Sequence, residues 1–117
     1  MKAIVRAITS PDVDLDTYRS EQPEDDGVWI RLIAGPADGP GEESFDVLVC
    51  TPLWLRRAVT VDGPQDGRHH LIVDPMNLKL AADYLRRRFE EADAADWPTL
   101  AEKLGRLGRW EFEDYRS

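Results

Sequence analysis

The 117-residue chain has one cysteine and two histidines, which are types that often serve in catalysis: Cys50, His69 and His70. A cysteine beside a histidine can form a nucleophilic dyad, and two histidines can ligate a metal ion. Adjacent residues of a strand point to opposite faces of a sheet, so a strand over 69–73 would keep the two imidazoles apart. A buried cysteine commonly packs as a small apolar residue. We therefore favour a structural interpretation; a small enzyme or ligand-binding domain that uses these residues is the alternative.

A second pattern, Asp12-x-Asp14-x-Asp16, resembles the opening of an EF-hand calcium loop. That loop needs Gly at its sixth position and Glu at its twelfth, where this chain has Thr17 and Pro23. The chain also lacks a phosphate-binding Gly-rich loop, a zinc-peptidase helix and a Gly-x-Ser-x-Gly elbow. We expect neither a metal nor a cofactor.

The distribution of charge is more informative than these motifs. The chain has 23 acidic and 15 basic residues and a formal net charge of -8. Residues 1–46 hold eleven acids and four bases, so nearly all the imbalance lies there. Nucleic-acid and anionic-membrane binding start from a basic patch, whereas an acidic surface suits a basic protein partner. Charge that serves only solubility is the alternative. The residues predicted to contact a partner are Asp14, Asp16, Glu24, Asp25, Asp26, Glu42 and Glu43, with Tyr18 and Trp110 as aromatic anchors.

Hydrophobic periodicity predicts the elements that position these residues. Alternating apolar side chains indicate strands over 2–9, 28–34, 44–51 and 69–73. Apolar stripes and capping residues indicate helices over 52–58 after Thr51, over 76–92, and after Asp96. The polar segment 10–27 connects the first two strands, and Val13, Leu15 and Tyr18 are expected to pin it to the body. The tail 109–115 suits an edge strand or a docked extended segment.

Strands that precede helices predict an α+β fold, with a mostly antiparallel four- to five-stranded sheet and two main C-terminal helices packed on one face. The length suits a single domain over 1–117. The start of the chain has no signal-peptide pattern, and no apolar run reaches the length of a membrane span. With Cys50 as the single cysteine, a reduced, cytoplasmic setting is expected.

Three segments carry a resemblance to a known family: ESFD at 43–46 followed by CTPLWL at 50–55, GRHH at 67–70, and GRWEFEDY at 108–115. In this order they resemble the immunity protein 8 family of bacterial polymorphic toxin systems. The resemblance implies a non-enzymatic α+β protein that binds and neutralises a cognate toxin domain. Such toxins are frequently nucleases, whose substrate-binding surfaces are basic.

The resemblance transfers no catalytic residue and does not say which residues touch the toxin. The resemblance implies a protein partner. The acidic composition argues against direct nucleic-acid or membrane binding, and the chain is expected to be a monomer or homodimer. An interaction module without inhibitory activity is a further alternative.

Overall fold

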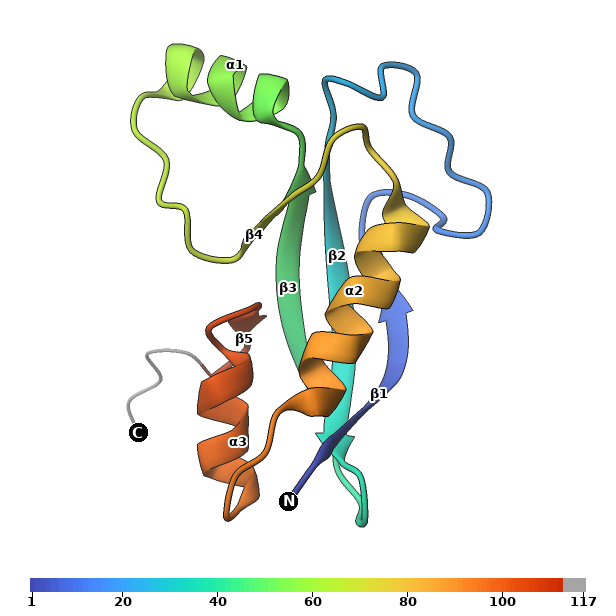
Figure 1. Cartoon of the computed structure of the whole chain (residues 1–117), viewed down its shortest axis with the longest axis vertical. Coiled ribbons are helices and arrows are strands. Elements are labelled where there is room, and N and C mark those ends of the chain that lie inside the picture. Colours follow the sequence, from blue (N-terminus) through green and yellow to red (C-terminus); the bar gives the residue numbers. More distant parts are fainter. Residues whose placement is uncertain (113–117) are drawn as a thin grey trace.

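The computed structural model describes residues 1–112, which form one mixed sheet and three helices (Figure 1). Along the chain the elements are β1 (Ala3–Thr9), β2 (Gly27–Pro36), β3 (Glu43–Cys50), α1 (Pro52–Asp62), β4 (His70–Ile72), α2 (Leu78–Glu91), α3 (Trp97–Leu104) and β5 (Arg109–Trp110). The predicted α+β class is confirmed, with five mostly antiparallel strands and two of the helices in the C-terminal half.

The sheet is built around the antiparallel pair β2–β3, with β1 antiparallel on the outer side of β2. Two short strands share the opposite edge. Strand β4 pairs parallel with Leu48–Cys50 of β3, and β5 pairs antiparallel with Phe45 and Asp46 of the same strand. The parallel pairing of β4 requires the chain to cross back after β3, and α1 with the following loop makes that connection.

One face of the sheet carries the hydrophobic core. Phe45 of β3 meets Phe89 of α2 edge to face, with ring centroids 5.3 Å apart. The predicted apolar stripes of α2 and α3 are confirmed as the helix faces that pack on the sheet. The buried helix residues are Leu78, Ala81, Leu85 and Phe89 in α2 and Leu100, Ala101 and Leu104 in α3.

Helix α1 is longer than predicted. Its N-cap is confirmed, since the Thr51 side chain accepts a hydrogen bond from the amide of Trp54 at 3.3 Å. The sequence predicted a short helix over 52–58. The helix instead continues to Asp62 and stops at Gly63, whose φ of 88° suits glycine and whose amide donates to the carbonyl of Val59.

Other element boundaries also differ from prediction. The strand expected over 69–73 is shorter, because His69 has a φ of 66° and cannot continue an extended strand. The helix expected from 76 begins at Leu78, since Asn77 caps it by accepting from the amide of Leu80 at 3.0 Å. Of the predicted tail, Arg109–Trp110 forms the edge strand β5, and residues 113–115 lie outside the described residues.

Candidate protein-interaction surface

The residues predicted to contact a partner lie at two opposite ends of the sheet. The acidic loop 10–26 leads into the start of β2, whereas the turn 37–42 follows the end of that strand (Figure 1). A ten-residue strand separates its ends by about 30 Å. Glu42, Glu43 and Trp110 therefore do not form one continuous patch with the loop.

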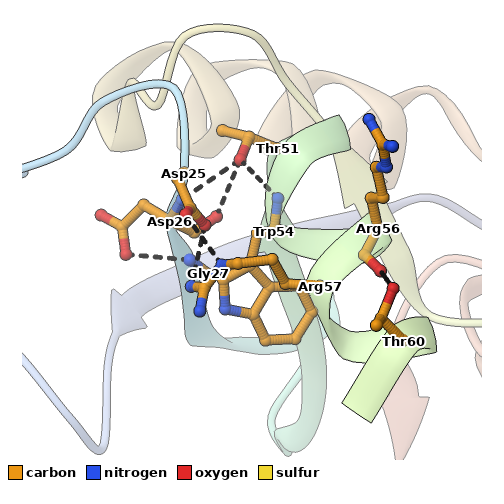
Figure 2. Close-up of polar contacts among 8 residues, drawn as sticks. All are labelled: Asp25, Asp26, Gly27, Thr51, Trp54, Arg56, Arg57 and Thr60. Carbon is orange, nitrogen blue, oxygen red and sulfur yellow. Dashed lines mark hydrogen bonds and ion pairs between the residues drawn. The ribbon is translucent and has the colours of Figure 1, made fainter. Parts of the chain in front are cut away.

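Asp26 is the hub that holds the acidic loop in place. Its carboxylate accepts hydrogen bonds from the Tyr18 hydroxyl, from Ser20 Oγ at 2.7 Å and from the Gly27 amide at 2.8 Å. Its own amide donates to Thr51 Oγ1 at 3.1 Å (Figure 2). Burial raises the pKa of Tyr18, and the hydrogen bond to Asp26 adds to that shift. The half-buried side chains of Asp26 and Tyr18 are thus hydrogen-bonded to each other.

Asp25 fastens the same end of the loop to α1. The Arg57 guanidinium meets it in two places, Nη2 donating to Oδ1 at 2.9 Å and Nε lying 2.8 Å from Oδ2 (Figure 2). The Asp25 side chain is 14% exposed, against 60% for that of Arg57. The Trp54 ring lies against the backbone of Gly27 so closely that a Cβ there would collide with it. The loop and α1 are therefore joined.

The remaining acids of the loop face solvent. Asp14 Oδ1 accepts from the amide of Asp16 at 2.9 Å, which closes a local turn. None of these exposed loop acids forms an ion pair with another of residues 1–112. We call this set of exposed acids the acidic loop surface: Asp12, Asp14, Asp16, Glu21 and Glu24. Asp12 and Glu21 were not among the residues predicted to contact a partner, although they lie in the same acidic segment.

At the other end of the sheet, Glu43 has an internal function. Its Oε2 accepts from Nε1 of Trp97 at 2.8 Å and from Nε1 of Trp110 at 3.1 Å. The Trp110 ring also meets Phe112 edge to face, with centroids 5.7 Å apart. Glu43 thereby ties α3 and β5 to the start of β3, and Glu42 beside it is exposed.

Two hollows flank helix α1. The cleft on the side of the acidic loop encloses about 550 Å³ between Pro23, Glu24, Asp25, Leu53 and Pro75. The second hollow, a groove of about 480 Å³, lies between α1 and β4, and its apolar lining includes Leu55, Val59 and Ile72. A third, of about 640 Å³, separates the loop from the first turns of α2.

The alternative site of Cys50, His69 and His70 does not assemble. Cys50 is fully buried, and burial raises the pKa of its thiol to about 11, which disfavours the nucleophilic thiolate. His69 Nε2 is hydrogen-bonded to the carbonyl of Gly105 at 2.8 Å, and His70 Nδ1 to the carbonyl of Arg68 at 3.0 Å. Within residues 1–112, no three His, Cys, Asp or Glu side chains are grouped to hold a metal ion.

The fold therefore defines a small α+β protein with a mixed five-stranded sheet over the described residues. Comparison with family models matches residues 3–115 to the model described as Immunity protein 8. The chain belongs to the immunity protein 8 family, whose members are typically non-enzymatic toxin inhibitors. Comparisons with curated proteins and with solved structures found no match. Among residues 1–112, no helix has both the length and the apolar character needed to cross a membrane.

Proposed function

We propose that this chain neutralises a cognate toxin domain by binding it through the acidic loop surface. The observation that carries this proposal is the set of five exposed carboxylates on one segment, without ion pairs among the described residues. Internal contacts of Asp25 and Asp26 hold that segment against the body, so its charges are presented in a defined arrangement. Such charges can steer a basic partner to the surface and raise its rate of association.

A toxin that cleaves nucleic acid would offer a fitting partner. Its substrate-binding surface must carry basic side chains to hold phosphates. An acidic protein seated on that surface would block the substrate without any chemistry of its own. This proposal places the protein in the cytoplasm, where the free thiol of Cys50 stays reduced.

The first test measures binding to the product of the neighbouring upstream gene, which is taken as the candidate toxin. A variant with D12N, D16N, E21Q and E24Q removes four charges from the acidic loop surface. We expect its association rate to fall about tenfold or more at low salt, because steering is lost. We also expect its rate to depend less on salt than that of the unaltered chain.

The matched control removes four exposed charges away from the loop, at Asp38, Glu42, Glu91 and Glu102. The control and the loop variant have the same net charge. A slower association rate of the loop variant alone would therefore be a local effect of the loop charges. Equal association rates for the two variants would contradict the acidic loop surface and leave toxin binding intact. Absence of a complex with the unaltered chain would contradict the proposed function.

A further inference from the structure

Helix α1 leaves its apolar side chains outside the core. It contributes no buried residue, in contrast to α2 and α3. Leu53 is 44% exposed, Val59 46% and Val61 79%. Exposed apolar side chains gathered on one element are typical of an interaction surface.

Polar contacts and one ring, rather than core packing, hold α1 in place. An isolated helix of eleven residues is marginal in water. Here Thr51 caps its start, Arg57 pairs with Asp25, and Trp54 lies on the backbone of Gly27 (Figure 2). The helix is thus positioned on the body while Leu53 and Val59 remain available.

The cleft beside α1 has the chemistry of a receptor for a basic side chain. Pro23, Leu53 and Pro75 supply apolar surface and Glu24 supplies an exposed carboxylate, whereas the carboxylate of Asp25 beside it is paired with Arg57. Lysine and arginine carry an aliphatic stem that packs on apolar surface and a cationic head that pairs with carboxylate. Asp25 already accepts one guanidinium within the chain, from a largely exposed arginine.

The groove on the other side of α1 is predominantly apolar. Leu55 and Val59 line it from the helix, and Ile72, which is 57% exposed, lines it from β4. An apolar side chain from a partner would cover these residues. The apolar groove on one side of α1 suits an apolar side chain of a partner, and the acid-rimmed cleft on the other side suits a basic one.

We propose that α1 is the ridge on which the toxin domain docks, with a lysine or arginine of the toxin in the cleft and an apolar side chain in the groove. This inference rests on the proposed function. Glu24 belongs to both the acidic loop surface and the cleft, so the two surfaces are continuous there. Charge favours the toxin over a second copy of this chain. A two-fold dimer through the ridge would bring the acidic rims of two chains, each of net charge -8, together.

The test compares three variants of exposed apolar residues in binding to the same toxin candidate. L53Q alters the cleft and V59Q the groove, and both keep a helix-compatible residue. L80Q is the matched control, since Leu80 lies in the first turn of α2, is 60% exposed and lines neither hollow. We expect L53Q and V59Q to weaken binding about tenfold or more, mainly through faster dissociation, and L80Q to leave it unchanged.

Thermal unfolding of the three variants verifies that each still folds. If L53Q and V59Q fold and bind as tightly as L80Q, the docking of the toxin on α1 is wrong. The proposed function would stand in that case, because the complex still forms. No complex with the unaltered chain would overturn both. A dimer of the free chain that L53Q dissociates would also overturn the proposal, because a second copy would then occupy the ridge.

Discussion

At the scale of single residues, neighbouring carboxylates of the loop have different functions. Glu24 faces solvent, whereas Asp25 is paired with Arg57 and Asp26 accepts three internal hydrogen bonds. A charge reversal of all three would therefore disturb the loop as well as its binding surface. Variants that test binding belong on exposed carboxylates such as Glu24.

Glu43 offers a residue-scale prediction about stability. E43A leaves the indole N–H groups of Trp97 and Trp110 without their shared acceptor, so we expect a loss of about 1 to 2 kcal/mol in the free energy of unfolding. E43Q keeps an acceptor oxygen and should lose less. Urea unfolding followed by tryptophan fluorescence measures both, and an E43A variant as stable as the unaltered chain would contradict the prediction.

The buried thiol of Cys50 predicts a pH dependence. Its pKa rises from the ordinary 9.0 to about 11 in the folded state, so the unfolded chain loses this proton first as pH increases. The stabilisation is complete below pH 9 and is lost as pH rises towards 11. We expect stability to fall less steeply in C50A than in the unaltered chain between these values. If the free energy of unfolding falls with pH at the same rate in C50A and in the unaltered chain, the raised pKa of Cys50 is contradicted.

At the scale of elements, α2 protects the outer edge of the sheet. Within residues 1–112, strand β1 has no neighbouring strand on that side, and unpaired edges invite association. Glu90 Oε2 accepts from the amide of Val5 at 2.9 Å, and Arg86 Nη1 donates to the carbonyl of Val5 at 2.9 Å. Because the two residues are four apart, one face of the helix satisfies both backbone groups.

The combined variant R86A/E90A should uncover this edge. We expect faster hydrogen exchange at the Val5 amide and more self-association at high protein concentration. The control R87A/E91A removes the same side-chain types from α2 without touching β1. If exchange at Val5 is equal in the two variants, the edge is protected by other contacts.

The junction between β3 and α1 depends on Thr51. Its buried hydroxyl oxygen accepts from the amides of Trp54 and Asp26, so it caps the helix and holds the loop together. We expect T51A to cost about 1 to 2 kcal/mol, the usual effect of losing an N-cap. T51S keeps the hydroxyl and should restore most of that stability. A T51S variant as unstable as T51A in denaturant unfolding would show that the hydroxyl is not what matters.

At the scale of the whole molecule, the net charge of -8 is a source of self-repulsion. The loop variant that neutralises Asp12, Asp16, Glu21 and Glu24 halves this charge. We expect it to melt at a higher temperature than the unaltered chain at low salt, and the difference to shrink in high salt because screening removes repulsion. A lower melting temperature would mean that these carboxylates stabilise the fold by contacts not evident in the structure.

The local patterns of the sequence determined much of the architecture. Apolar alternation identifies the strands of the β2–β3 hairpin, and Thr51-Pro52 and Asp96 mark helix starts, because each pattern depends on backbone geometry within a few residues. The loop residues Val13, Leu15 and Tyr18 pack against the core as expected. The family was also recognisable from short segments along the chain.

Only the tertiary structure decided which carboxylates remain available. Asp26 meets Thr51 across 25 positions, and Glu43 meets Trp97 and Trp110 across 54 and 67. The same holds for the separation of Glu42 from the acidic loop, which follows from strand direction. Residue type sets the charge of a side chain, but its partners are set by chain crossings that bring distant segments together, and no local pattern encodes those.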